Sequence, residues 1–348
     1  MNWLNEAGPE RDVTLTSRIR LARNIADIPF PTVMLPEHAR QVAEKVRNSI
    51  FDFSGHQRFA GIKFAYIKMS DVPEIERQIL VEKHLASQDL MEHPEVSAIL
   101  LDSNEEITVM INEEDHIRMQ CVLPGFQLSK AWETISYIDD LIEEQVDYAF
   151  HEEFGYLTSC PTNVGTGLRS SVMMHLPGLT MSNQMNAILQ TITKIGLTAR
   201  GIYGEGSEAL GSIYQISNQV TLGPTEEDII NNLSIVSRQI VDKERQARKA
   251  LRQAGGIQFE DSLWRACGLL LHARIMSLKE FMSLISSVRL AVSMGLIPGV
   301  ALEKIDAVMT MGQPANVMKK AGGRLKGKEV DVERANIIRG AMREILNL

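Results

Sequence analysis

Arginine residues recur in parts of this sequence that otherwise have the pattern of strands or of glycine-rich loops. Residues 16–24 read Thr-Ser-Arg-Ile-Arg-Leu-Ala-Arg-Asn. Because successive side chains of a strand point to opposite faces, Arg18 and Arg20 share one face and the apolar side chains beside them share the other. Three further segments supply the remaining candidates, Arg118, Arg169 and Arg200. Forked guanidinium groups bind phosphate oxygens in pairs, so this cluster predicts a site for a polyphosphate and for a phosphoryl group in transfer.

Two acidic residues accompany these arginines. Strand alternation over 112–120 predicts that Glu114, His116, Arg118 and Gln120 line one face, with Glu114 and Arg118 roughly 13 Å apart. Glu205 follows Arg200 in a second glycine-rich segment. If the acceptor of the phosphoryl group is itself a guanidinium, paired carboxylates bind it and align it for attack. One of the two also serves as general base, and the sequence leaves open which.

More ordinary interpretations exist for the same residues. The polar faces are also typical of solvent-facing stripes with cross-strand ion pairs. Cys160 supplies a reactive thiolate if the arginines lower its pKa, or is a structural cysteine. Residues 204–209 resemble a dinucleotide fingerprint but precede a strand pattern, and 322–328 resemble a phosphate loop without its Ser or Thr. No metal site is predicted, because three widely spaced cysteines form no ligand set.

Elements of regular structure must position these side chains. Hydrophobic periodicity predicts helices over 36–51 and 129–150 and strands over 96–101, 107–121 and 211–218. A capping box at Thr225 opens a long helix that ends near Gln253, and Gly255-Gly256 marks the domain boundary. Four further helices are expected over 261–276, 277–295, 302–311 and 331–348. The predicted fold is α+β, with an antiparallel sheet flanked by helices in residues 1–254 and a small all-helical domain in 255–348.

Composition excludes several classes of protein. The chain has 348 residues, 44% of them hydrophobic, and a net charge of −8 from 36 basic and 44 acidic residues. This composition excludes disorder, and the acidic balance argues against direct binding of nucleic acid. No apolar run approaches the roughly 20 residues of a membrane span, and no signal segment is visible. An odd number of cysteines without a close pair favours a reducing, cytoplasmic location.

The four arginine-bearing segments, in this order, closely resemble those of the ATP:guanidino phosphotransferases, the arginine and creatine kinase family. The likeness runs from about Thr16 to Gln253 and includes Asn-Glu-Glu-Asp-His-Ile-Arg and Cys-Pro-Thr-Asn-Val-Gly-Thr-Gly-Leu-Arg. It implies ATP as phosphoryl donor, with Mg²⁺ carried by the nucleotide. It also implies that Glu114 and Glu205 bind the guanidinium and that Cys160 is the active-site cysteine. The nucleotide-binding residues that it implies are Ser17, Arg18, Arg20, His84, Arg118, Arg169, Ser170, Ser171 and Arg200.

The arrangement of the two units along the chain is similar to that of the bacterial protein-arginine kinases within this family. Members that act on free arginine or creatine carry a helical domain before the Ser-Arg-Ile-Arg segment, whereas here only residues 1–16 precede it and a helical unit follows instead. An open site suits a side chain on a polypeptide. The resemblance implies a homodimer that phosphorylates protein arginines, marks proteins for a Clp-type protease and inactivates a heat-shock repressor. An activator protein is a further candidate partner, and the sequence leaves open whether activity requires it. The alternatives are a kinase of free guanidino compounds and a non-catalytic phosphoarginine-binding adaptor.

The C-terminal unit contains a partial motif of the same group. Residues 330–335 resemble Arg-Asp-x-x-Arg-Ala, with Val330 in place of the first arginine. The resemblance implies allosteric binding of phosphoarginine by Asp331 and Arg334.

Overall fold

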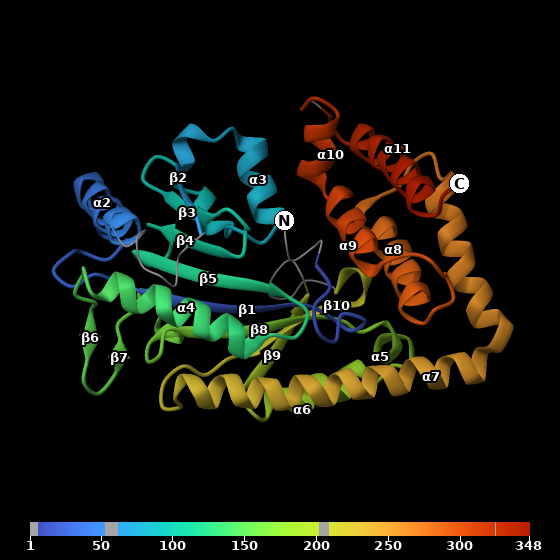
Figure 1. Ribbon diagram of the computed structural model, residues 1–348, viewed down its shortest axis with the longest axis horizontal. Coiled ribbons are helices and arrows are strands. Elements are labelled where there is room, and N and C mark those ends of the chain that lie inside the picture. The colour runs from blue at the N-terminus through green and yellow to red at the C-terminus, as the bar shows by residue number, and fades with distance from the viewer. Residues whose placement is uncertain (1–5, 53–61, 202–208, 324) are drawn as a thin grey trace.

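The computed structural model describes residues 6–52, 62–201, 209–323 and 325–348. Their centre is an antiparallel sheet of eight strands in the order β2-β3-β4-β5-β1-β8-β10-β9 (Figure 1). The strands are β1 (Thr14–Arg23), β2 (Phe64–Lys68), β3 (Ala98–Asp102), β4 (Ile107–Ile111), β5 (Ile117–Pro124), β8 (Leu168–His175), β9 (Leu197–Gly201) and β10 (Ile213–Asn218). A separate ribbon pairs β6 (Phe150–His151) with β7 (Gly155–Tyr156). The antiparallel sheet confirms the predicted fold class.

Helices cover most of one face of this sheet. They are α2 (Pro36–Asp52), α4 (Leu128–Glu143), α5 (Pro177–Met181), α6 (Met185–Thr193) and the first part of α7 (Glu226–His272). Helix α4 presents Ile135, Ile138 and Ile142, at helical spacing and fully buried, to the same core that holds Ile19 and Leu21 of β1. Figure 1 shows α4 and α7 lying along this side of the sheet. The apolar half of the β1 alternation therefore forms the core, as predicted.

The other face is covered at the β3–β4 end by α3 (Glu74–Glu82) and the turns around it, which enclose a small core containing Met69, Leu90, Ile99 and Met110. Short 3₁₀ turns occupy Met69–Asp71, Asp89–Met91, Pro161–Asn163 and Leu210–Ser212. The middle of this face carries the arginines described below. No helix in the described ranges is both long enough and apolar enough to cross a membrane.

A second core belongs to the C-terminal helices. These are the end of α7, α8 (Leu278–Ser293), α9 (Leu302–Met311), α10 (Pro314–Lys320) and α11 (Lys328–Ile345), grouped beyond one end of the sheet in Figure 1. The capping box at Thr225 is present. At Gly256 the backbone leaves helical geometry, with φ 48° and ψ −130°, so α7 consists of two helices that meet at a kink where the sequence predicted the first helix to end. We propose that this kink is the boundary between the two units.

Two predicted elements end elsewhere in the structure, and one helix of the C-terminal unit was missed. The helix expected over 129–150 ends at Glu143, because the following backbone turns to form a bridge between Tyr148 and Ile25. The strand expected over 107–121 is split by a turn, in which Asn112 has a left-handed φ of 58°. Helix α10 was not predicted. Pro314 begins it, because proline fits the first helical position, where no backbone N–H is needed.

A buried ion pair between Arg11 and Asp306, shared with Arg289, joins the two units. Asp306 of α9 accepts hydrogen bonds from Arg11 Nε at 3.0 Å and Arg289 Nε at 2.7 Å, and all three side chains are almost fully buried. Arg289 Nη1 also lies 3.2 Å from Nδ1 of His175, at the end of β8. Burial, followed by Arg289 and Arg248, lowers the pKa of His175 well below its usual range, so its imidazole is neutral. Nδ1 therefore accepts from Arg289 and Nε2 donates to Ser286 of α8 at 2.8 Å.

Asp306→Ala removes the shared counter-charge of two buried guanidinium groups. We expect the free energy of unfolding to fall by about 3–5 kcal/mol, the usual cost of deleting one partner of a buried ion pair. Urea denaturation measures the loss. The control is Glu260→Ala, which breaks an exposed pair with Arg252 and is expected to cost less than about 1 kcal/mol. Similar small losses in both variants would contradict this account of the interface.

Candidate active site

Strand register places the predicted arginines on one face of the sheet. Arg20 of β1 lies opposite Gln120 of β5 on one side and Arg169 of β8 on the other. Arg118 of β5 lies opposite Ala22 of β1, two residues beyond Arg20. Residues paired across neighbouring strands point to the same face, and so do residues two apart. Arg18, Arg20, Arg118 and Arg169 therefore share the face turned away from α4 and α7.

Strands β10 and β9 extend this face. Ser171 of β8 lies opposite both Arg18 and Ser217, and Gln215 lies opposite Arg200. Five arginines from four strands thus occupy one surface, which we call the arginine face: Arg18, Arg20, Arg118, Arg169 and Arg200. Gln215 and Ser217 were missed in the sequence, although their spacing of two on a predicted strand would have identified them.

The electrostatics of the arginine face are those of an anion site. Arg18 donates from Nη2 to Gln215 Oε1 at 3.0 Å, and burial, with repulsion from Arg118 and Arg169, lowers its pKa to about 10. Burial and the neighbouring arginines also lower the pKa of Arg20 well below its usual range. Nε of Arg20 is buried and has no hydrogen-bond partner among the described residues. Buried donors and buried like charges are both stabilised by a bound polyanion, so these residues fit the phosphates of a nucleotide.

Arg118 already has an acidic partner, which sequence analysis missed. Its Nη1 lies 2.5 and 2.7 Å from the carboxylate oxygens of Glu113. Burial alone would raise the pKa of Glu113, but the arginine outweighs it and holds that pKa below the usual range. The turn after Asn112 brings Glu113 back over β5, a geometry that strand alternation does not reveal.

The same turn makes the predicted stripe through Glu114 and His116 wrong. His116 is fully buried, accepts the backbone N–H of Ile25 at Nδ1 (3.0 Å) and donates from Nε2 to the carbonyl of Pro29 (2.9 Å). It therefore fixes the hairpin and does not join the arginine face. Gln120 does lie on that face, where its Nε2 donates to the carbonyl of His84 at 2.8 Å.

The loop that carries Cys160 is held against the hairpin that carries Glu114, at the end of the face near Arg118. Asp115 accepts the backbone N–H of Ser159 at 2.6 Å, which ties the cysteine loop to the hairpin. Asn163 Nδ2 lies 3.5 Å from Glu114 Oε2, and the Sγ of Cys160 lies 3.0 Å from the Oγ1 of Thr162. Burial, partly opposed by Arg118, raises the pKa of Glu114, as suits a proton acceptor. Glu205, the second predicted acid, lies outside the described residues.

His84 lies at the other end of the face. Its side chain lines a small cavity together with Arg18, Ser171 and Gln215. Burial, followed by the charge of Arg18, lowers the pKa of His84 to about 4, so the imidazole is neutral at pH 7. Its backbone has a left-handed φ of 59°, which is uncommon for a residue with a side chain.

Two predicted serines have their side chains away from the arginine face. Ser17 donates its hydroxyl to the carbonyl of Gly125 and accepts the N–H of Gln127, both at 2.9 Å, just before α4. Ser170 alternates with Arg169 and Ser171 on β8 and is fully buried on the helix-covered side. Of the three serines, only Ser171 shares the face of the arginines.

Asp331 and Arg334 have a structural role that runs against the predicted phosphoarginine site. Arg334 is 2% exposed and donates to the carbonyls of Gly312 and Met276 at 2.8 and 2.9 Å. Its third partner is the carboxylate of Asp331 at 2.5 Å. These bonds join α11 to the end of α9 and to the segment just before α8, and they leave the guanidinium buried and already hydrogen-bonded.

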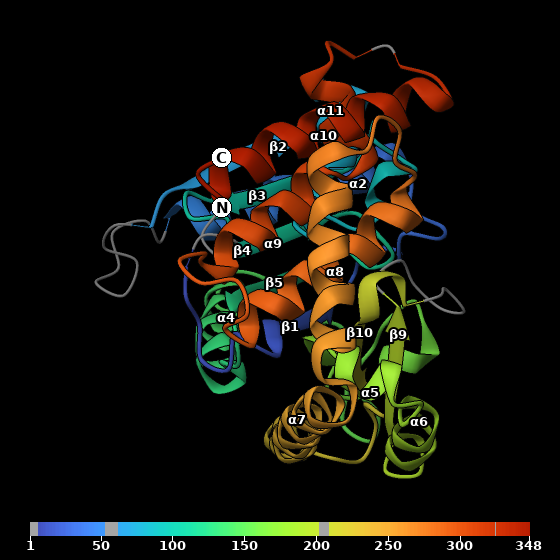
Figure 2. The same ribbon diagram turned by 90° about the vertical axis from the view of Figure 1, so that its right-hand side faces the viewer.

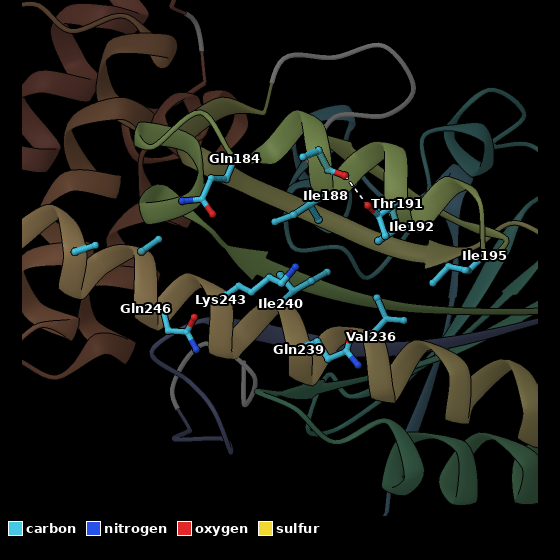
Figure 3. A pocket seen from close by; sticks show the side chains of 13 residues that line it. Gln184, Ile188, Thr191, Ile192, Ile195, Val236, Gln239, Ile240, Lys243 and Gln246 are labelled. Atoms are coloured by element: carbon cyan, nitrogen blue, oxygen red, sulfur yellow. Dashed lines mark hydrogen bonds between the residues drawn. The ribbon is translucent and has the colours of Figure 1, made fainter.

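A larger groove lies elsewhere, between α6 and α7 (Figure 3). Ile188, Ile192 and Ile240 form its floor, and glutamines and Lys243 surround it. It contains none of the predicted site residues.

Comparisons with known proteins show the family of the chain. Residues 41–247 match the family model of the ATP:guanido phosphotransferase C-terminal catalytic domain, and residues 256–347 match that of the protein-arginine kinase McsB C-terminal domain. The chain is 47% identical to the protein-arginine kinase of Desulforamulus reducens over 99% of this chain and 96% of that protein. It is 48% identical to the protein-arginine kinase of Bacillus subtilis over 97% of this chain and 92% of that protein.

Solved structures share the fold. A lombricine kinase superposes with a TM-score of 0.60 and 24% identity, covering 72% of this chain and 70% of that one. The duplicated taurocyamine kinase of Schistosoma mansoni with transition-state analogue components gives a TM-score of 0.61 and 21% identity, covering 94% of this chain and 43% of that one.

Proposed function

The chain belongs to the ATP:guanido phosphotransferase family, and from this membership we propose that it transfers the γ-phosphoryl group of ATP to arginine side chains of proteins. The relatives named protein-arginine kinase match nearly the whole chain, including the C-terminal helices. The observation that carries the proposal is the arginine face itself, five guanidinium groups on one surface with Glu114 beside Arg118.

The arginine face would bind the nucleotide phosphates. Arg18, Arg20 and Arg169 are adjacent across β1 and β8, which suits a chain of phosphates. Mg²⁺ would arrive on the nucleotide, held by phosphate oxygens and water, and would neutralise charge that develops in transfer. The guanidinium groups keep their positive charge in place before the reaction begins, so little reorganisation is needed at the transition state.

Glu114 would serve the acceptor. A protonated guanidinium is a poor nucleophile, so a nitrogen must lose a proton as it attacks phosphorus. The N–P bond forms, the bond from phosphorus to the bridging oxygen of ADP breaks, and the proton passes to the carboxylate of Glu114. The raised pKa of that carboxyl group favours proton acceptance. Glu205 would supply the second carboxylate and Cys160 the neighbouring thiol, as the family resemblance implies.

In the cell, the modified proteins, the oligomeric state and the location of the enzyme complete the proposal. We propose that the modified proteins pass to a Clp-type protease, that a heat-shock repressor is among the substrates, and that an activator protein controls the enzyme, in line with the resemblance to protein-arginine kinases. We also propose a homodimer through the helical unit, as the family resemblance implies, and light scattering tests it. Three unpaired cysteines favour a cytoplasmic location, and the net charge of −8 is unfavourable for nucleic acid.

The test is incubation with magnesium ATP and either a protein substrate or free arginine, followed by mass spectrometry for acid-labile phosphoarginine. Phosphate on protein arginines and none on free arginine is expected. Efficient phosphorylation of free arginine would instead indicate a kinase of small guanidino compounds. Binding of phosphoarginine without any transfer would indicate an adaptor.

A further inference from the structure

A single carboxylate on α3 joins the sheet domain to the beginning of α10. Glu82 accepts the backbone N–H of Ala315 at 2.6 Å and that of Asn316 at 3.1 Å, and also the side-chain amide of Asn316 at 2.7 Å. Figure 1 shows α3 and α10 side by side at this contact. The first turn of a helix has backbone N–H groups without partners in the helix, so a carboxylate there makes strong, charge-assisted bonds. Glu82 thus holds α3 to the helical unit at both carboxylate oxygens.

Glu82 is also the last residue of α3, two positions before His84. The intervening turn is rigid, since the N–H of Lys83 bonds to Ile79 and the N–H of His84 bonds to Val81. His84 then takes its left-handed conformation, and Gln120 of β5 holds its carbonyl. Backbone strain of this kind persists only where the surroundings enforce it. Here the enforcement comes from β5 on one side and, through Glu82, from α10 on the other.

The helical unit also restrains the other end of this contact. Arg334 of α11 bonds to the carbonyl of Gly312, two residues before Pro314 begins α10. A second link between α3 and α10, from Lys319 to Glu76 at 2.8 Å, is largely exposed. Because exposed pairs contribute little, the Glu82 contact is the stronger of these two polar links.

We propose that Glu82 is a positioning residue for the kinase reaction, through which the helical unit holds His84 in place beside Arg18 in the nucleotide part of the arginine face. The inference rests on the proposed function, in which this face binds ATP. In this view the helical unit helps to form the nucleotide site of its own chain.

The first measurement is the affinity of magnesium ATP, by calorimetry with no phosphoryl acceptor. Glu82→Ala is expected to weaken ATP binding about tenfold, the equivalent of one or two hydrogen bonds. In steady-state assays the KM for ATP rises by a similar factor, while kcat at saturating ATP changes less than about twofold, since Glu82 does not touch the reacting atoms. Glu82→Gln keeps the volume and one acceptor oxygen, so an intermediate affinity is expected.

Glu76→Gln is the matched control, because it weakens the exposed link between the same two helices. It is expected to leave ATP affinity unchanged. An equal loss in both variants would show that any weakening of the α3–α10 contact suffices, and would overturn a specific role for Glu82. If Glu82→Ala does not fold, the comparison rests on Glu82→Gln against Glu76→Gln.

A double-mutant cycle separates this inference from the proposed function. If Glu82 acts through His84, the loss in Glu82→Ala/His84→Ala is no larger than in His84→Ala alone. Additive losses, or full affinity in the Glu82 variants, overturn the positioning role while leaving the kinase assignment intact. Failure of the wild-type protein to bind ATP would instead overturn the proposed function, and this inference with it.

Discussion

Arg20→Ala is expected to lower kcat/KM for ATP by about 10³-fold or more, the range found when an arginine that neutralises a transferred phosphoryl group is removed. Arg20 lies at the centre of the arginine face, between Gln120 and Arg169. Its Nε has no hydrogen-bond partner among the described residues, and its charge is disfavoured by burial and by the adjacent arginines. Glu113 favours the charge of Arg20 only weakly, because burial and the adjacent arginines outweigh it, so an anionic ligand would stabilise this guanidinium.

The same variant is expected to be as stable as the wild-type protein or slightly more stable without nucleotide, because like-charge repulsion is relieved. Steady-state kinetics measures the loss of kcat/KM, and urea denaturation measures the unchanged or higher free energy of unfolding. Arg252→Ala, on the exposed part of α7, is the control and should change neither quantity appreciably. A fall of less than about tenfold in kcat/KM would show that Arg20 does not bind the phosphates.

Glu114→Gln is expected to lower kcat by about 10²–10⁴-fold, the usual contribution of a positioned general base. The affinity for magnesium ATP should be almost unchanged, because Glu114 lies in the hairpin turn and not among the arginines of β1 and β8. Rapid-quench measurement of phosphoarginine formation reports the chemical step. Glu92→Gln, an exposed acid outside the site, is the control. Near-normal kcat in the Glu114 variant would assign the proton transfer to another group.

The pH dependence of the wild-type enzyme follows from the same residue. Burial raises the pKa of the Glu114 carboxyl above its ordinary value of 4.5, and only the deprotonated form accepts a proton. The rate should therefore fall as the pH drops through that raised pKa, and Glu114→Gln should lose this limb of the profile. Because the folded state disfavours the ionised carboxylate, Glu114→Gln should also slightly raise the free energy of unfolding at neutral pH.

The parts of the site that sequence predicted correctly depend on local periodicity. Alternation along β1 placed Arg18 and Arg20 together and the apolar side chains opposite, and the structure has that arrangement. The same rule failed at His116, because alternation assumes an uninterrupted strand and the left-handed Asn112 ends it. As a result, Glu113 lies beside Arg118 in the structure, where strand alternation had predicted His116.

Other features depend on contacts between distant segments, which no local pattern contains. Arg334 resembles a ligand-binding arginine in its motif, but the carbonyls of Gly312 and Met276 bury it. Glu82 is an ordinary acid at the end of a helix until α10 is placed against it. Residue type therefore predicted the kind of chemistry better than it predicted which side chains are free to bind a ligand.

The buried pairs around Asp306 determine how the chain unfolds. Leu15, Met173 and Ile213 of the sheet belong to the core of the helical unit, and Figure 2, viewed from that unit, shows α8 in front of β10. Separating the units would expose this apolar surface and would leave Arg11, which belongs to the sheet unit, without the carboxylate of Asp306. The two halves should accordingly melt in one cooperative transition. A fragment cut at the Gly256 kink would lack part of its core, so the helical unit is not expected to fold as an independent module.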